Sequence, residues 1–157
     1  MIGLVIQARN GSRRYPRKSI QTLSNRMVLE WVLRRAGKAQ VDVKILATSL
    51  LEEDEIIERI ALCMGWQVIR GHPHDVLSRY ATAASKFGLS VVVRVTADCP
   101  LIDPNIINLA CKKYLETGAD YLCFEDIING FNVEVIKAEW ILKADQKAKL
   151  PSEREHV

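Results

Sequence analysis

The sequence predicts an α/β protein in which helices cover both faces of a mostly parallel sheet. Short apolar runs of strand length alternate with stretches whose apolar residues recur at helical spacing, and this alternation is typical of βαβ units. The chain of 157 residues is 48% hydrophobic and has no Pro-, Gly- or Ser-rich linker, so it can bury one core. We therefore expect a single domain, residues 1–157, built as a three-layer sandwich.

In the first half of the chain, strands are expected over residues 2–6, 43–48 and 66–70, and helices near residues 28–36 and 52–64. Ser24 or Asn25 is a suitable cap for the first helix. The four acidic residues 52–55 suit the positive end of the second helix, and Gly65 suits its end. We interpret these acids as a solvated helix start rather than as a metal or catalytic site.

In the second half, helices are expected near residues 76–87, 104–117 and 137–147, and strands over residues 90–95, 120–124 and 133–136. The strand at 90–95 is the most β-branched run in the chain, which favours a central position in the sheet. Asp103 is expected to cap the helix that begins at Pro104. Ser152 and Glu155 match a capping box that would start one more helix.

A strongly basic loop, Gln7–Lys18, follows the first strand. It places five Arg and Lys residues around Gly11 and Ser12. The first 29 residues hold six basic residues and no acidic one, whereas the remainder holds 16 basic and 19 acidic residues. The loop matches neither of the phosphate motifs G-x-x-x-x-G-K-[ST] and G-x-G-x-x-G. Two interpretations stay open, a polyphosphate site at the end of a strand and a solvated basic loop.

One acidic residue, Asp98, follows the expected central strand and should lie at the same carboxyl edge of the sheet as the basic loop. A carboxylate that faces a polyphosphate needs a divalent cation between them, and Mg²⁺ is bound by one or two carboxylates together with phosphate oxygens. Asp98 is therefore a candidate metal ligand. The other interpretation is a turn residue that bonds its own backbone before Cys99 and Pro100.

Five segments carry a specific pattern when they are taken together. They are QARNGSRRYPRK after the first strand, RG at 70–71 with DVL at 75–77 and RY at 79–80, RVTADCPLIDP from residue 94, NVEV from residue 132, and the closing SEREHV. The pattern resembles that of the cytidylyltransferases of CMP-sugar synthesis, above all their SpsF-like branch in spore coat polysaccharide biosynthesis, over essentially the whole chain. This resemblance implies a Rossmann-like nucleotide-diphospho-sugar transferase fold.

The resemblance also implies a reaction. A sugar hydroxyl would attack the α-phosphate of CTP and release pyrophosphate, with Mg²⁺ as the cofactor and a sugar acid or amino sugar as the acceptor, for surface polysaccharide or glycan biosynthesis. Such a transfer is catalysed mainly by positioning and by stabilising phosphate charge. The implied catalytic residues are Arg9, Lys18 and the metal ligand Asp98. The implied nucleotide-binding residues are Ala8, Arg9, Gly11, Ser12, Arg14, Lys18, Arg70, Asp75 and Arg94.

Some of these residues have a second interpretation. Asn132 and Glu134 would lie on the sugar side, but Glu134 is equally suited to point to solvent from an edge strand. Arg94 is equally suited to be one half of a charge pair, and Asp75 to be a helix cap. No role is assigned to His156 in the closing segment.

The chain departs from the family pattern at a few positions. Asn10 stands where methionine is common, Arg17 and Ala97 where glycine is usual, and Asn132 where an aspartate usually opens the D-V-E-V motif. An amide cannot replace the charge of a carboxylate near a metal, although its oxygen can still coordinate one. The family chains continue beyond the H-V at which this sequence stops, so we expect a C-terminally shortened form. A nucleotide- or sugar-nucleotide-binding domain without turnover is the alternative function.

Other classes of protein fit the sequence less well. A nucleic-acid-binding module is disfavoured because the chain beyond residue 29 is net acidic and lacks a basic face. No apolar run approaches 18 residues and no signal peptide pattern is present, so we expect a cytoplasmic protein that has no membrane partner. The resemblance implies a homodimer.

Overall fold

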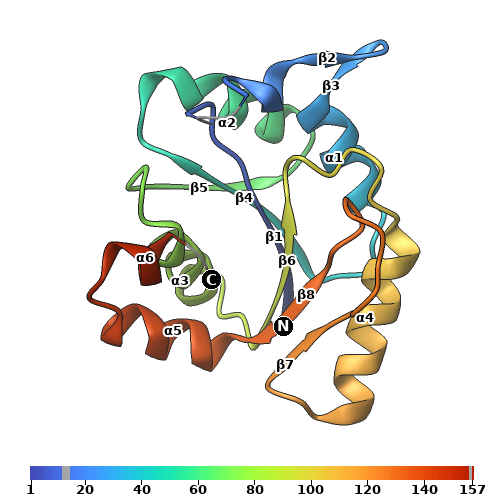
Figure 1. Ribbon diagram of the computed structural model, residues 1–157, viewed down its shortest axis with the longest axis vertical. Helices are drawn as coiled ribbons and strands as arrows, with labels where there is room; N and C mark the ends of the chain where they lie inside the picture. The colour runs from blue at the N-terminus through green and yellow to red at the C-terminus, as the bar shows by residue number, and fades with distance from the viewer. Residues whose placement is uncertain (12–14, 156) are drawn as a thin grey trace.

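Strand β1 (Ile2–Gln7) lies in the middle of a six-stranded sheet in a computed structural model that describes residues 1–11, 15–155 and 157 (Figure 1). The strand order is β5-β4-β1-β6-β8-β7. The other strands are β4 (Val43–Ser49), β5 (Gln67–Gly71), β6 (Val91–Thr96), β7 (Tyr121–Cys123) and β8 (Glu134–Lys137). The pairs β1–β4, β1–β6 and β4–β5 are parallel, whereas β8 is antiparallel to both β6 and β7. The predicted mostly parallel sheet is confirmed.

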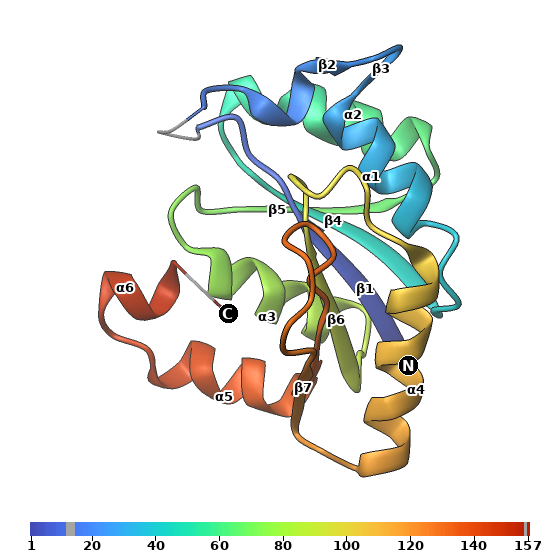
Figure 2. The same cartoon turned by 45° about the vertical axis from the view of Figure 1, so that its right-hand side comes forward.

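Helices cover both faces of this sheet (Figure 2). One face packs against α1 (Val28–Ala36), α2 (Glu55–Cys63) and α4 (Pro104–Thr117). The other face packs against α3 (Val76–Lys86) and α5 (Ala138–Lys147). The short helix α6 (Pro151–Arg154) contacts α3. These layers confirm the three-layer α/β sandwich.

The alternation of side chains along β1 explains why it is the central strand. Leu4 and Ile6 belong to the core under α1, α2 and α4, whereas Val5 belongs to the core under α3 and α5. All three are fully buried, as expected for a strand covered on both faces. Val93 and Val92 of β6 divide between the same two cores, so the predicted central position of this β-branched strand is also confirmed.

Two expected helix starts were wrong. Ser24 and Asn25 do not cap α1, because the chain first forms a projecting hairpin of β2 (Thr22–Leu23) and β3 (Arg26–Met27), in which Ser24 has a φ of 59° (Figures 1 and 2). Instead, Glu30 Oε2 accepts a 2.8 Å hydrogen bond from the Met27 amide.

Ser152 and Glu155 likewise do not form the expected capping box. Glu153 accepts hydrogen bonds of 2.9 Å from the amides of both Lys149 and Leu150, so α6 begins at Pro151. Glu153, two positions before the expected Glu155, reaches these free amides, and the helix therefore begins two positions earlier than expected.

Two 3₁₀ turns flank the carboxyl edge of the sheet, η1 (Lys18–Ile20) and η2 (Glu52–Asp54). The acids predicted to start a helix therefore form η2 and the first residue of α2. In residues 1–11, 15–155 and 157, no helix combines the length and apolar character needed to cross a membrane.

The cap of α4 provides a stability test. Asp103 accepts a 2.8 Å hydrogen bond from the Asn105 amide, as predicted. We expect Asp103→Ala to lower the free energy of unfolding by about 1 kcal/mol, the usual cost of losing an N-cap. Asp103→Asn keeps an acceptor at the same place and should stay close to the parent. Urea unfolding followed by circular dichroism measures both, and equal losses in the two variants would contradict the capping role.

Candidate functional site

The strand order reverses direction at the carboxyl ends of β1 and β6. From β1 the chain continues through β4 to β5 on one side, and it returns to β6 on the other side of β1. The loops that leave these two neighbouring strands therefore diverge, and open parallel sheets bind ligands at such a switch point. The basic loop follows β1 and the Asp98 turn follows β6, so both candidate segments lie there.

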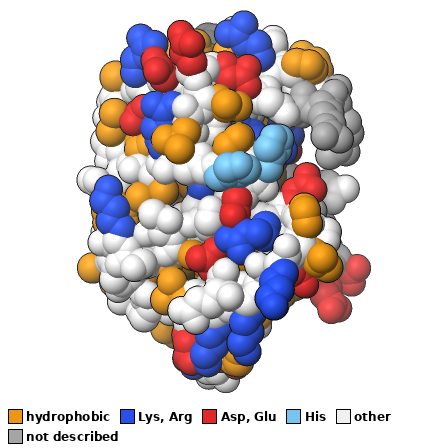
Figure 3. Space-filling model, turned by 90° about the vertical axis from the view of Figure 1, so that its left-hand side faces the viewer, with side chains coloured by type: hydrophobic (Ala, Val, Ile, Leu, Met, Phe, Trp, Pro, Cys, Tyr) orange, Lys and Arg blue, Asp and Glu red, His pale blue; other side chains and the backbone are white. Residues whose placement is uncertain are grey.

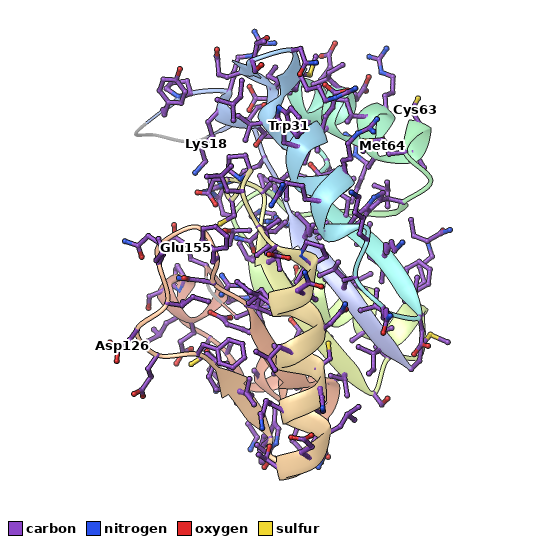
Figure 4. The ribbon with its side chains drawn as sticks, turned by 90° about the vertical axis from the view of Figure 1, so that its right-hand side faces the viewer. Lys18, Trp31, Cys63, Met64, Asp126 and Glu155 are labelled. Atoms are coloured by element: carbon purple, nitrogen blue, oxygen red, sulfur yellow. The ribbon has the colours of Figure 1, made fainter. Side chains whose placement is uncertain are left out.

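Lys18 and Asp98 meet across this switch point. The Lys18 Nζ donates a hydrogen bond to Asp98 Oδ2, and the two side chains form an ion pair. Their side chains are 33% and 43% exposed, so the pair faces solvent rather than the core. Figure 4 shows Lys18 reaching from its loop toward the loop after β6. The topology thus brings together the predicted phosphate-binding lysine and the predicted metal ligand.

The pKa of Asp98 reflects this pair. Partial burial acts to raise the pKa, but hydrogen bonds from Lys18 and Thr96 and the charge of Lys18 outweigh it, so the pKa lies below the ordinary value of 3.8. Because the folded-state pKa is lowered, the stabilisation by the pair is complete above the ordinary pKa and is lost as the pH falls through the folded value.

Arg9 extends from the basic loop to the turn after β5. Its Nη1 donates a 2.9 Å hydrogen bond to the Pro73 carbonyl and lies 3.4 Å from His74 Nδ1. Figure 3 shows the two described histidines side by side on this face, with acidic and basic side chains directly below them. Beside Arg9, Ala8 is buried and its amide bonds to the Ala47 carbonyl, whereas Gly11 is exposed.

The side chain of Arg70 is engaged within the fold. It donates to the carbonyls of Ser49 and Leu51 at 2.9 and 3.0 Å, and to Glu58 Oε2 at 2.8 Å. These contacts tie the end of β5 to the start of η2 and to α2. Each of its three nitrogens thus has a partner in the fold.

Both carboxylate oxygens of Asp75 are also engaged. Oδ1 accepts from the Ser78 amide at 2.9 Å and caps α3, and Oδ2 accepts from Arg154 Nε at 2.6 Å. Arg154 also binds Asp145 Oδ1 at 2.5 Å, so one guanidinium fastens α6 to α5 and to the start of α3. Burial acts to raise the pKa of Asp75, but the bonds from Arg154 and Ser78 lower it. The capping interpretation is confirmed.

Arg94 and Glu134 form a second ion pair, at 2.6 Å, between directly opposite residues of β6 and β8. Burial acts to lower the pKa of Arg94, but its interactions with Tyr80 and Glu134 raise it. The charge-pair interpretation of Arg94 is confirmed, and Glu134 is turned to this partner. Asn132 is exposed in the segment before β8.

Three residues singled out in the sequence lie outside the described part of the chain. They are Ser12 and Arg14 of the basic loop and His156 of the closing segment. In the part that the structure describes, no group of three or more His, Cys, Asp or Glu side chains is placed to hold a metal ion.

Two buried charged residues at this edge were not predicted. Asp54 is completely buried although it belongs to the acids interpreted as solvated, and Arg79 is only 2% exposed. Arg79 Nη1 donates to the His72 carbonyl, and an added Cβ on Gly71 would lie 2.8 Å from Arg79 Cγ. The helical phase could have revealed both residues, because Asp54 is in phase with buried Ile57, and Arg79 with buried Val76.

This strand order, with a basic loop and a carboxylate meeting at the switch point, defines a Rossmann-like α/β protein of the nucleotidyltransferase type. The comparisons with known proteins narrow the class. The chain belongs to the cytidylyltransferase family, whose model matches residues 4–156. The resemblance inferred from the motifs is thereby confirmed.

Individual relatives are similar over nearly all of this chain. A protein of uncharacterized function from Methanocaldococcus jannaschii is 36% identical over 154 residues, 98% of this chain and 63% of that protein. The spore coat polysaccharide biosynthesis protein SpsF of Bacillus subtilis is 29% identical over 159 residues, 98% of this chain and 66% of that protein. A solved cytidylyltransferase structure from Leptospira borgpetersenii has a TM-score of 0.93 at 31% identity, over 99% of this chain and 68% of that chain. The chain thus spans about two thirds of these relatives.

The ion pair at the switch point makes a prediction about titration. We expect Lys18→Met to raise the pKa of Asp98, because the burial that opposes ionisation stays while the cation is lost. A ¹³C NMR titration of the carboxyl carbons without metal measures the midpoint. Lys38→Met, which removes an exposed lysine just after α1, is the matched control and should not move it. An unchanged Asp98 midpoint in Lys18→Met would show that the two side chains are not paired in solution.

Proposed function

We propose that this chain carries the nucleotide site of a cytidylyltransferase that transfers CMP from CTP to a sugar and releases pyrophosphate. The observation that carries the proposal is the meeting of Lys18 and Asp98 at the switch point of a fold that belongs to this family. An ammonium group and a carboxylate side by side suit a triphosphate and its cation, respectively.

In this proposal the basic loop binds the triphosphate. Arg9 and Lys18 supply positive charge to the phosphates, and Gly11 supplies a backbone position that a phosphate can approach closely because it has no side chain. Ser12 and Arg14 of the same loop, together with Ala8, Arg70, Asp75 and Arg94, complete the proposed nucleotide-binding set. The contacts of Arg70 and Asp75 with neighbouring elements suit a supporting role, in which they hold the elements around the switch point in place.

Asp98 is the proposed ligand of Mg²⁺. Its exposed carboxylate at the edge fits this ion, which is commonly held by one or two carboxylates plus phosphate oxygens. When bound, the cation would neutralise phosphate charge that develops during transfer. Lys18 is then free to leave Asp98 and to bind a phosphate oxygen, so the ligand replaces one ion pair by two favourable contacts.

The acceptor is proposed to be a sugar acid or an amino sugar, on the side of the switch point where Arg94 pairs with Glu134 and where Asn132 is exposed. The likeness to SpsF supports surface polysaccharide biosynthesis as the setting. The homodimer implied by the family resemblance stays a prediction. The second candidate function is a nucleotide-binding domain without transfer, which is favoured by Asn132, an amide where the family usually has an aspartate.

Thermal unfolding with CTP, GTP, UTP or ATP, each with Mg²⁺ or with EDTA, tests the nucleotide site. A ligand at about a hundred times its Kd adds roughly 2.7 kcal/mol, and each kcal/mol moves the midpoint by roughly 2–4 °C for a chain of this size. We therefore expect a rise of roughly 5–10 °C with CTP that requires Mg²⁺. Lys18→Ala and Asp98→Asn should remove most of the rise, and the control Lys38→Ala should keep it. No shift with any nucleotide would refute the proposal.

Pyrophosphate release with a panel of sugar acids and amino sugars then separates the two candidate functions. Release that depends on CTP, Mg²⁺ and one acceptor supports the transferase, and Asp98→Asn should abolish it. Binding of CTP without release from any acceptor would favour the binding domain.

A further inference from the structure

Asp54 is a buried carboxylate whose role is not capping. It stands at the N-cap position of α2 but makes no hydrogen bond to that helix. Its side chain turns inward, where Oδ1 accepts a 2.7 Å hydrogen bond from the Asn10 amide and Oδ2 accepts one from the Ser49 hydroxyl. A carboxylate that is fully buried is retained only where such bonds compensate its lost hydration.

Asn10 is fixed from three directions. Its amide donates to Asp54, its side-chain Nδ2 donates to the Glu53 carbonyl at 2.5 Å, and its carbonyl accepts from the Arg17 amide at 3.0 Å. Asn10 is itself only 2% exposed. The start and the exit of the basic loop are thus fastened at one residue, and that residue is attached to η2.

The side chain of Asn10 adds a second bond to this attachment. Methionine, which is common at this position in the family, has no donor for the Glu53 carbonyl. The next residue, Gly11, lies beside the same turn, since an added Cβ would come within 3.6 Å of Glu53 Oε1. In this chain, therefore, polar bonds attach the loop between Arg9 and Gly11 to the second βα unit.

A buried cation accompanies the buried carboxylate. Burial and the charge of Arg9 lower the pKa of Arg79, whereas the charge of Asp54 acts to raise it. Among the described residues, Arg79 Nε has no hydrogen-bond partner. The two guanidinium groups of Arg9 and Arg79 donate to successive carbonyls of one turn, those of Pro73 and His72. The charge of Asp54 therefore also partly offsets the positive charges of Arg9 and Arg79.

We propose that Asp54 and Asn10 form a positioning pair that holds residues 9–11 of the basic loop in the conformation that receives a triphosphate. This inference rests on the proposed function. The pair touches no reacting group. The pair fixes the backbone between Arg9, which binds phosphate in the proposed function, and Gly11, which leaves room for the phosphate. Loss of the pair should therefore weaken contacts to the β- and γ-phosphates and leave contacts to the nucleoside unchanged.

Binding of CTP and CMP, each measured by calorimetry with Mg²⁺, tests the pair. In Asp54→Ala we expect about tenfold weaker CTP binding, which corresponds to the loss of one charge-assisted hydrogen bond, and unchanged CMP binding. Asn10→Ala removes only the bond to Glu53 and should weaken CTP binding by roughly threefold. Glu52→Ala, an exposed acid of the same turn, is the matched control and should match the parent. Equal losses for CTP and CMP, or no loss, would overturn the proposal.

A second measurement does not depend on nucleotide binding. Amide hydrogen exchange followed by NMR should show the Asn10 amide protected in the parent and exposed in Asp54→Ala, while the amides of β1 stay protected. If Asp54→Ala does not fold, Asn10→Ala decides the CTP comparison. If the parent protects Asn10 but binds no nucleotide, the proposed function fails and the attachment of the loop stands. An unprotected Asn10 amide in the parent refutes the positioning pair by itself.

Discussion

The parallel pairing of β1 with both β4 and β6 is the constraint on which the rest of the structure depends. Gln7 stands opposite Ala47 on one side and Thr96 on the other, so three strands end at nearly the same level. The segments that follow them start as neighbours although they are far apart in the sequence. Lys18 and Asp98, 80 positions apart, can meet only because this register aligns their strands.

The two ion pairs at this edge differ in how easily their side chains can separate. The Arg94–Glu134 pair links two strands and is well covered, with side chains 14% and 26% exposed, whereas the Lys18–Asp98 pair is more open to solvent. Separating an open pair costs less, because water screens its attraction. The covered Arg94–Glu134 pair thus stabilises the sheet, whereas the Lys18–Asp98 pair, which separates more easily, lies where the proposed ligand would bind.

Much of this arrangement could be predicted because the spacing of apolar residues along the sequence indicates which side chains are buried. All strands of the main sheet were expected within about two residues of their bounds, and the placement of the basic loop and Asp98 at one edge followed from the rule for parallel sheets. The ion pair between Lys18 and Asp98 was not itself expected. Periodicity carries no information about strand direction, so the antiparallel β8 could not be foreseen, and the hairpin at 22–27 is too short to show a pattern. The inward turn of Asp54 was missed because its charge was given more weight than its helical phase.

The close approach of Gly71 to Arg79 has a consequence for how such a sequence can evolve. The stem of Arg79 occupies the space that any side chain at position 71 would need. A larger residue at 71 is therefore tolerated only after position 79 has changed to a shorter one. Substitution in the other order forces the buried guanidinium away from the carbonyl that it binds. The two sites should covary across relatives, and the order of their replacements should be constrained.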